Sequence, residues 1–243
     1  MPIDLNGNII TSTSIVSDAF TGSIVTSGLT MHLDAGNKNS YVGTGTTIND
    51  LTSNGYNGTL TSGPTYSNGY ISFDGVDDYI TMGTAMDFAT YTSGFTIDLW
   101  VYPTSAATFS SIFSSAWGTS GTQWQVYVWY NTSSQFGTTQ RYGASQNDFN
   151  TSNTFAINNW HNVVVTSNNS VCYIYVNGRD QVKSVTGQIN NQDATREVRL
   201  GNFKNYASAQ YTGRIATCRV YNRPLNNIEI LSNYYSQKSR FGL

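Results

Sequence analysis

Charged residues are scarce in this chain of 243 residues, in which Asp, Glu, Lys and Arg together make up 11%. This composition leaves little material for charged amphipathic helices. The basic residues stand singly, without the clusters of Lys and Arg that mark a phosphate-binding surface, so we expect no nucleic-acid partner. Residues 1–100 carry one lysine and nine acids, whereas residues 101–243 carry eleven bases and five acids. We expect strands from both halves to mix in one body and neutralise each other.

The chain has two cysteines and no long apolar run. Cys172 and Cys218 lie in apparent strands, which favours two reduced thiols in the core, with a disulfide between them as the less favoured alternative. The first residues, MPIDLNGNIITSTS, have neither a basic leader nor enough apolar length for a secretory signal or a membrane span. We therefore expect a chain that stays in the compartment where it is made and inserts into no membrane.

Glutamate and histidine are rare as well, with two residues of each. Glycoside hydrolysis requires two carboxyls that flank one bond. Glu229 is better explained as a helix cap, which leaves Glu197, and the strand expected over Phe95–Tyr102 carries a single acid, Asp98. His32 and His161 do not lie in a spacing suited to a metal or a nucleophile relay. We predict a protein with no catalytic residues and no enzyme activity.

Glycine, with 22 residues, and aromatic side chains, at 14%, are plentiful. Trp160–Gly178 alternates around a polar turn and closes with Asn177-Gly178, which predicts a β-hairpin followed by a third strand near Arg179. Its apolar residues point to both faces, which is typical of strands inside a sheet. Further strands are predicted at Leu29–Asp34, Gly69–Phe73, Tyr79–Met82, Phe95–Tyr102, Phe109–Phe113, Trp124–Tyr130, Glu197–Gly201 and Gly213–Tyr221. Many short strands joined by short turns predict an all-β, two-sheet antiparallel β-sandwich of the jelly-roll kind.

One helix is predicted near the end of the chain. Asn226 and Glu229 have the spacing of a capping box, and Ile228, Leu231 and Tyr235 follow at helical spacing. The chain then divides into an N-terminal arm over residues 1–28, which serves assembly, a sandwich over residues 29–235, and an exposed C-terminal tail over residues 236–243.

The stretch from Trp117 to Tyr142 is the strongest candidate for a binding surface. Alternation through Trp124–Tyr130 places Tyr127 and Trp129 on the face opposite the core. Trp117, Tyr127, Trp129 and Tyr142 are therefore candidates for a carbohydrate platform or a subunit contact, of which we favour the contact slightly. Packing of this face beneath a loop is the alternative without a binding role.

Asp74, Asp77 and Asp78 are the densest group of acids in the chain. Their spacing lacks the ordered series of acids found in a dedicated calcium loop, and Asp74-Gly75 is a common turn. We favour Asp74 as a cap of backbone N–H groups. We predict no cofactor and no metal, with calcium kept as a minority alternative that Asp34 and Asp50, in loops, would also serve.

Seven segments, taken in order, resemble the laminin-G-like, concanavalin A-like lectin sandwiches. They are GLTMHLDAGN (Gly28–Asn37), DLTSNGYNGTL (Asp50–Leu60), ISFDGVDDYITMG (Ile71–Gly83), GFTIDLWVYP (Gly94–Pro103), NNWHNVVVT (Asn158–Thr166), YIYVNG (Tyr173–Gly178) and YTGRIATCRVYNRPLNNIEILSNYY (Tyr211–Tyr235). Together they cover most of the chain from Gly28 onward. This fold hosts lectins, hydrolases and adhesion modules, so it names no activity unaided.

A narrower resemblance concerns the final run, NYYSQKSRFGL, which is similar to the end of laminin-G-like virion proteins of tailed, particularly marine, bacteriophages. It implies a non-enzymatic virion surface protein, made in the host cytoplasm, that decorates the capsid or belongs to the tail or fibre. Its expected partners are other virion proteins, further copies of itself in a homo-oligomer and host-surface glycans. A carbohydrate-binding module that recognises host glycans is the alternative function.

Overall fold

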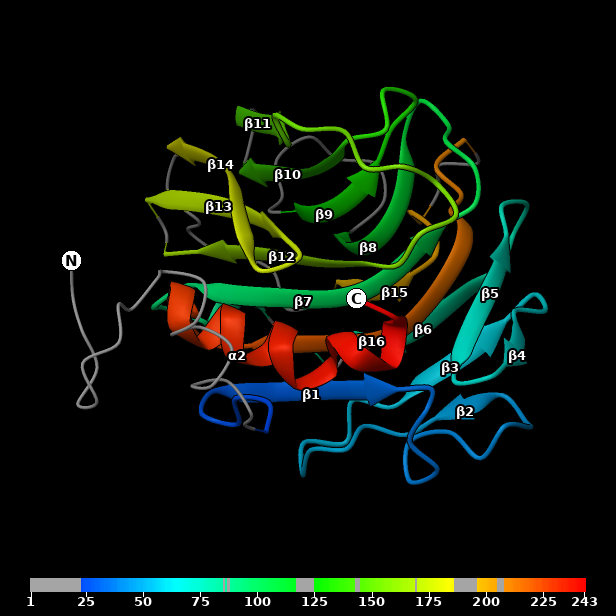
Figure 1. Cartoon of the computed structure of the whole chain (residues 1–243). Helices are drawn as coiled ribbons and strands as arrows, with labels where there is room; N and C mark the ends of the chain where they lie inside the picture. The colour runs from blue at the N-terminus through cyan, green and yellow to red at the C-terminus, as the bar shows by residue number, and fades with distance from the viewer. Residues whose placement is uncertain are drawn as a thin grey trace, which may run out of the picture.

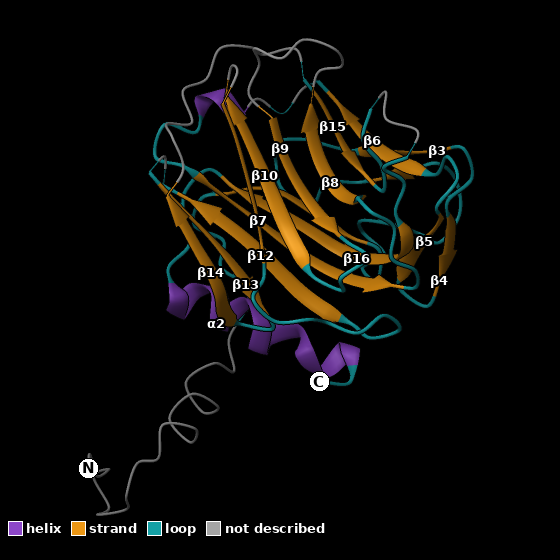
Figure 2. Cartoon of the chain, turned by 90° about the horizontal axis from the view of Figure 1, so that it is seen from above, coloured by secondary structure: helices purple, strands orange, loops and turns teal. Residues whose placement is uncertain are grey.

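The structure of the protein is a computed structural model that describes residues 23–84, 86, 88–116, 125–142, 145–168, 170–185, 196–204 and 208–243. Two antiparallel sheets pack face to face, and the helix α2 (Asn227–Gln237) lies across the outer face of one of them (Figures 1 and 2). This arrangement confirms the predicted two-sheet β-sandwich with one short C-terminal helix.

The first sheet, which carries α2, has the strand order β14-β13-β12-β7-β16-β5-β4. The long strand β16 pairs with β5 through Thr212–Ile215 and with β1 through Thr217–Tyr221. The strands of this sheet are β1 (Leu29–Asp34), β4 (Thr65–Ser67), β5 (Tyr70–Asp74), β7 (Phe95–Pro103), β12 (His161–Ser167), β13 (Val171–Val176), β14 (Arg179–Val185) and β16 (Thr212–Tyr221).

The second sheet has the order β11-β10-β9-β8-β15-β6-β3-β2. Its strands are β2 (Thr47–Ile48), β3 (Gly58–Thr61), β6 (Tyr79–Gly83), β8 (Ser110–Ala116), β9 (Gln125–Tyr130), β10 (Phe136–Tyr142), β11 (Ser145–Asn150) and β15 (Glu197–Leu200). A 3-10 turn, η1 (Phe88–Thr90), lies in the chain between β6 and β7. The strands predicted from alternation are all confirmed, whereas β2, β3, β4, β10 and β11 were not predicted.

The main core lies between the two sheets. The side chains that β12 and β13 contribute to it are Val163, Val165, Cys172, Ile174 and Val176. These residues alternate with outward-facing ones, as strand geometry requires. The hairpin and the third strand beginning at Arg179 are confirmed. Cys172 and Cys218 are both free and buried in this core, as predicted.

A polar layer joins the first sheet to α2. Asp98 on β7 and Arg219 on β16 are fully buried and form an ion pair, with Nε 3.8 Å from Oδ2. Asn162 Nδ2 donates to Asp98 Oδ1 at 2.7 Å, and Asn233 Nδ2 of α2 donates to Asp98 Oδ2 at 2.9 Å. Arg219 Nη2 donates to Gln237 of α2. Directed bonds of this kind fix the position of the helix more tightly than apolar contact alone.

The residues after Tyr235 do not form the exposed tail that the sequence suggested. The helix α2 continues to Gln237, and a 3-10 turn, η2 (Lys238–Phe241), follows it. Phe241 stacks on the buried ring of Trp100, and Arg240 Nη1 lies 2.8 Å from Asp34 Oδ1. The segment docks because the sandwich offers it an aromatic face and a carboxylate.

The described end of the N-terminal arm, residues 23–28, is bonded to the same face of the sandwich. Val25 N donates to Asn233 Oδ1 at 2.8 Å, and the Tyr221 hydroxyl donates to Val25 O at 3.1 Å. Arg223 Nε donates to Ser27 O at 3.0 Å. The arm therefore joins the sandwich beside α2. Among the helices that the structure describes, none has the length and apolar character needed to cross a membrane.

Candidate binding groove

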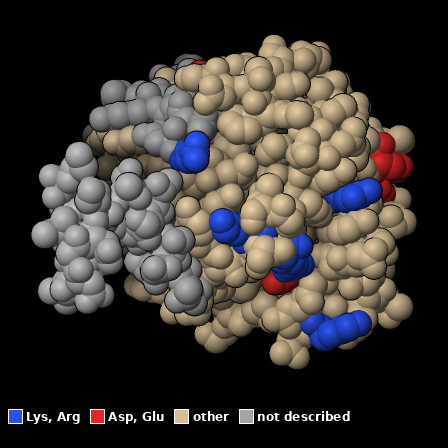
Figure 3. Space-filling view, in the orientation of Figure 1, with Lys and Arg blue, Asp and Glu red and all other residues tan. Residues whose placement is uncertain are grey.

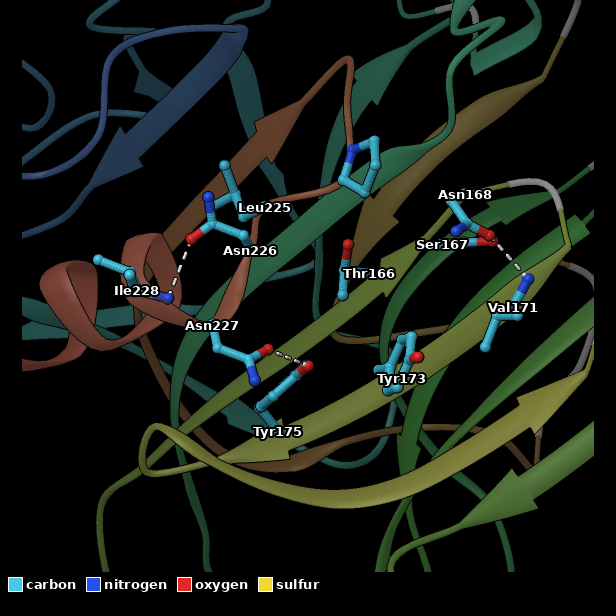
Figure 4. A pocket seen from close by; sticks show the side chains of 11 residues that line it. Thr166, Ser167, Asn168, Val171, Tyr173, Tyr175, Leu225, Asn226, Asn227 and Ile228 are labelled. Carbon is cyan, nitrogen blue, oxygen red and sulfur yellow. Dashed lines mark hydrogen bonds between the residues drawn. The ribbon is translucent and has the colours of Figure 1, made fainter.

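A groove of about 630 Å³ opens on the outer face of the first sheet, between the β12–β13 hairpin and the segment that leads into α2 (Figure 4). Its two walls come from distant parts of the sequence, which meet because β12 pairs with β7 and β7 pairs with β16. Eleven residues line it. Those that matter for its chemistry are Asn168, Tyr173, Tyr175, Asn226, Asn227 and Ile228.

Two tyrosines of β13 lie in the wall formed by the hairpin. Alternation along the strand turns Cys172, Ile174 and Val176 into the core, so Tyr173 and Tyr175 point outward. Their ring centroids are 6.1 Å apart. The two rings pack on a second apolar cluster, which lies beneath α2 and includes Val164, Tyr221, Leu225 and Ile230. This cluster holds Tyr175 buried and Tyr173 partly buried.

Asparagine side chains stand on both sides of the groove, and their oxygens are already engaged. Asn168 Oδ1 accepts from Val171 N at 2.8 Å and closes the β12–β13 turn. Asn226 Oδ1 accepts from Ile228 N and Glu229 N at 2.9 and 3.0 Å and caps α2. Backbone N–H groups can only donate, so these contacts fix which end of each amide is oxygen. No partner for either Nδ2 is found among the described residues.

Asn227 is engaged in the same sense, because the Tyr175 hydroxyl donates to its Oδ1 at 2.7 Å (Figure 4). Ile228 forms an apolar lip, with 67% of its surface exposed. Every described residue that lines the groove is uncharged. Figure 3, which shows the face that carries α2, likewise has its few charges as separate spots on a largely uncharged surface. In its described part the groove combines aromatic surface with amide donors and carries no charged side chain.

The aromatic candidates from the sequence lie elsewhere, on the outer face of the second sheet. Tyr127 is 5% exposed and Trp129 is 8% exposed, and the two rings pack against Phe109 and Phe203. Trp129 Nε1 donates to Thr139 Oγ1 at 3.1 Å. Rings buried to this extent offer little surface on which a sugar could stack, and their geometry matches the alternative in which this face packs beneath loops.

The other two aromatic candidates have no described side chain. Trp117 lies outside the described residues. Tyr142 ends β10 and pairs with Ser145, and its side chain lies outside the described part of the structure. The structure therefore brings Tyr127 and Trp129 together and does not describe their grouping with Trp117 and Tyr142.

Two of the three clustered aspartates accept hydrogen bonds from the backbone of a turn. One carboxylate oxygen from each of Asp74, Asp77 and Asp78 lies within 4.8 Å of the others. Asp74 Oδ1 accepts from Val76 N at 2.8 Å, and Asp78 Oδ2 accepts from Asp74 N at 2.9 Å. Asp74 thus caps backbone amides, as expected. Burial raises the pKa of Asp78. These bonds give the cluster a structural role in the turn between β5 and β6.

Both glutamates are held ionised by cations. Burial favours a higher pKa for Glu197, but hydrogen bonds from Arg199 and Lys204, at 2.7 and 2.6 Å, outweigh it and lower the pKa to about 2. Arg223 binds both carboxylate oxygens of Glu229 and lowers its pKa. A general acid needs a carboxyl that stays protonated near neutral pH. Neither glutamate meets this requirement.

The sequence matches the profile of the concanavalin A-like lectin/glucanases superfamily, of laminin G type, over residues 74–231. This match spans more than half of the chain, and the chain belongs to that superfamily. It is a lectin/glucanase-like β-sandwich domain. No curated protein sequence matches the chain.

Solved structures with the same fold include the following three. Domain 4 of AbnA, a GH43 extracellular arabinanase from Geobacillus stearothermophilus in complex with arabinotriose, has a TM-score of 0.67 at 18% identity, over 85% of this chain and 98% of that domain. Trypanosoma rangeli sialidase in complex with 2,3-difluorosialic acid has a TM-score of 0.67 at 18% identity, over 89% of this chain and 34% of the sialidase. A heptameric SAP-like pentraxin from Limulus polyphemus has a TM-score of 0.52 at 14% identity, over 67% and 79%.

The chain therefore spans about a third of the length of the sialidase. At these identities the likeness establishes the fold alone.

The groove was not predicted from the sequence. The alternation of the hairpin puts Tyr173 and Tyr175 on one face of the strand and Cys172, Ile174 and Val176 on the other, and this was the one signal present. Asn168 and Asn226 read as an ordinary turn former and an ordinary helix cap, which they also are. The spacing of Asn168 and Asn226 in the sequence does not indicate that both amides border one groove.

Proposed function

We propose that this domain is a non-enzymatic, carbohydrate-binding module carried on the surface of a tailed-bacteriophage virion, where it contributes to adhesion to the host. The groove beside α2 supports the binding role most directly, because it places tyrosine rings next to amide donors. Sugars offer apolar ring faces that stack on aromatic side chains and hydroxyls that pair with such donors. The arabinotriose bound to the arabinanase domain of the same fold is consistent with this role.

The non-enzymatic part of the proposal rests on the carboxylates. Hydrolysis of a glycosidic bond uses a protonated carboxyl and a second carboxylate on either side of it. The described residues that line the groove supply neither, and Glu197 and Glu229 are each paired with arginine. Binding without cleavage is therefore the activity that this chemistry favours.

The virion part rests on the resemblance of the run Asn233–Leu243 to phage surface proteins. In the structure this run ends α2, forms η2 and docks on Trp100, so it is an integral part of the fold. The described end of the N-terminal arm lies beside it and leads to residues 1–22. Other virion proteins, in the capsid or the tail, and further copies of this chain are the partners that we propose for these chain ends.

A glycan array probed with the labelled chain tests the binding role, and an assay for reducing ends with mixed polysaccharides tests the lack of cleavage. We expect array signal without release of reducing ends. An array on which no glycan is bound rules out the carbohydrate role, and steady release of reducing ends rules out the non-enzymatic one.

Particle incorporation tests the virion role. In phage that carry a tagged gene for this chain, electron microscopy with a labelled antibody should find the tag on the particle surface. Deletion of residues 1–22 leaves the described sandwich intact, and we expect it to reduce incorporation. A tag absent from purified particles would contradict the virion role, and full incorporation of the deleted chain would contradict the assembly role of the arm.

A further inference from the structure

We infer that the groove beside α2 binds neutral oligosaccharides and discriminates against sialylated and other acidic glycans, with Asn168 and Asn226 as the donors that grip the sugar. The inference rests on the proposed carbohydrate-binding function and adds to it a location and a ligand class.

The two asparagine side chains at the groove present hydrogen-bond donors to a ligand. The amide oxygens of Asn168 and Asn226 each accept hydrogen bonds from two backbone N–H groups, at 2.8 to 3.2 Å. These bonds hold both amides in place. Each is exposed and keeps an Nδ2 with two hydrogens at the groove. The two amides belong to opposite walls (Figure 4). The groove therefore offers fixed donors from two sides to a ligand rich in acceptors, such as the hydroxyl, ring and glycosidic oxygens of a sugar.

The charge of the residues around the groove decides which class of sugar fits it. An acidic sugar brings a carboxylate, and removing that charge from water is unfavourable unless a cation pairs with it. Among the described side chains that line the groove, none is lysine, arginine or histidine. Arg223, in the segment that leads to α2, is already paired through both terminal nitrogens with Glu229. The described lining thus matches a neutral ligand and gives an acidic one no counter-charge.

The shape of the groove also suits a sugar. Tyr173 is partly buried on the wall that the hairpin forms, and Ile228 stands 67% exposed beside the cap of α2. The two residues frame the groove with apolar surface while the asparagines provide its donors. Pyranose and furanose rings have this same division between apolar faces and polar edges. A volume of about 630 Å³ accommodates a short oligosaccharide.

Two substitutions remove the donors and leave the fold intact. Aspartate is as good a helix cap as asparagine, so Asn226→Asp keeps the bonds to Ile228 N and Glu229 N. Asn168→Asp likewise keeps the acceptor that closes the β12–β13 turn. Each replaces an Nδ2 donor by a carboxylate oxygen, which only accepts, so an acceptor oxygen of the sugar loses its hydrogen-bond donor. The double variant Asn168→Asp/Asn226→Asp should therefore fold normally and bind poorly.

Asn131→Asp is the matched control. Asn131 Oδ1 accepts from Ser133 N and Gln135 N at 3.0 Å in the turn between β9 and β10, so the substitution makes the same chemical change in a comparable turn. That turn belongs to the second sheet, away from the groove. If the added negative charge alone weakened sugar binding, the affinity of the control variant would fall in the same direction as that of the double variant.

The experiment is calorimetric titration of the full chain with four probes: arabinotriose, maltotriose, lactose and 3′-sialyllactose. We expect the wild type to bind at least one neutral probe. Where lactose binds, the affinity for 3′-sialyllactose should be at least about tenfold weaker than the affinity for lactose. The double variant should bind the neutral probe at least about tenfold more weakly than the wild type does. The control variant should bind like the wild type. Melting temperatures of all variants are measured alongside, and the single variants Asn168→Asp and Asn226→Asp replace the double variant if that one unfolds.

The results separate the inference from the function on which it rests. Neutral sugar binding that survives the double variant would overturn the location and leave carbohydrate binding standing. Tighter binding of 3′-sialyllactose than of lactose would overturn the ligand class. Failure to bind any of the four probes, together with a glycan array on which nothing is bound, would overturn the proposed function itself.

Discussion

Phe241 of η2 stacks on Trp100 of β7, with ring centroids 4.0 Å apart and ring planes inclined by 16°. Trp100 is fully buried although it points away from the main core, because Tyr234 of α2 covers it as well, at 5.8 Å. The last described turn of the chain is thus part of the packing of the first sheet. Its removal would uncover an indole in the middle of that sheet.

Phe241→Ala should lower the free energy of unfolding by about 2 to 3 kcal/mol, somewhat below the range for a fully buried phenylalanine, since Phe241 is partly exposed. Urea unfolding measures this directly. Leu243→Ala, at a position with 44% exposure, serves as the control and should change the free energy by less than about 0.5 kcal/mol. Equal effects from the two variants would show that η2 does not pack on Trp100.

The buried pair of Asp98 and Arg219 gives a second test. Arg219→Met should destabilise the fold by about 3 to 5 kcal/mol, because it leaves the Asp98 carboxylate without its cation. Glu229→Gln breaks the partly exposed pair with Arg223 and keeps the capping box, so it should cost less than about 1 kcal/mol. Chemical denaturation of both variants provides the comparison, and a small effect at Arg219 would mean that this pair is not buried.

The free energy of unfolding should fall as the pH is lowered, because His32 takes up a proton more readily in the unfolded chain than in the folded one. Burial, and secondly the Arg219 guanidinium, lower the pKa of His32 from 6.5 to about 4. The unfolded chain therefore takes up a proton near pH 6.5 that the folded chain takes up only near pH 4. Stability is full above pH 6.5 and decreases as the pH falls toward 4, by roughly 3 kcal/mol.

Urea unfolding at about pH 7 and about pH 4.5 measures this decrease. His32→Gln should remove most of it. Burial also lowers the pKa of His161, so His161→Gln should remove a further part in the same direction. A wild-type protein and a His32→Gln variant with the same loss of stability between the two pH values would contradict the assignment.

The two cysteines should be chemically silent in the folded protein. Burial raises the pKa of both the Cys172 and the Cys218 thiol, and each is fully buried. A thiol reacts as the thiolate, so an aromatic disulfide reagent should titrate no thiol in the native state and both after unfolding in guanidinium chloride. Rapid reaction of either cysteine under native conditions would show that the core opens there.

The sequence revealed the strands that alternate strongly and missed those that do not. Val163, Val165, Ile174 and Val176 recur with period two, and the hairpin was predicted with its turn and its third strand. The strand β10 reads FGTTQRY and β11 reads SQNDFN, without a regular apolar pattern. They form strands because β9 offers β10 an edge, and β10 in turn offers one to β11.

The site was harder to predict than the fold for a physical reason. The groove lies between Asn168, in a turn, and the Asn226–Ile228 segment, which the sheet brings together from distant parts of the chain. The aromatic stretch around Tyr127 and Trp129 drew attention by composition, although those rings are packed against Phe109 and Phe203. Composition indicates where aromatic surface exists, but only tertiary packing decides whether that surface is open.

The most direct measurement of the central claim is a crystal structure of the full chain with bound arabinotriose or maltotriose. We expect a sugar ring beside Tyr173, with its oxygens within hydrogen-bond distance of the Asn168 and Asn226 amide nitrogens. A sugar bound instead on the outer face of the second sheet, around Tyr127 and Trp129, or cleaved between two carboxyl groups, would contradict it.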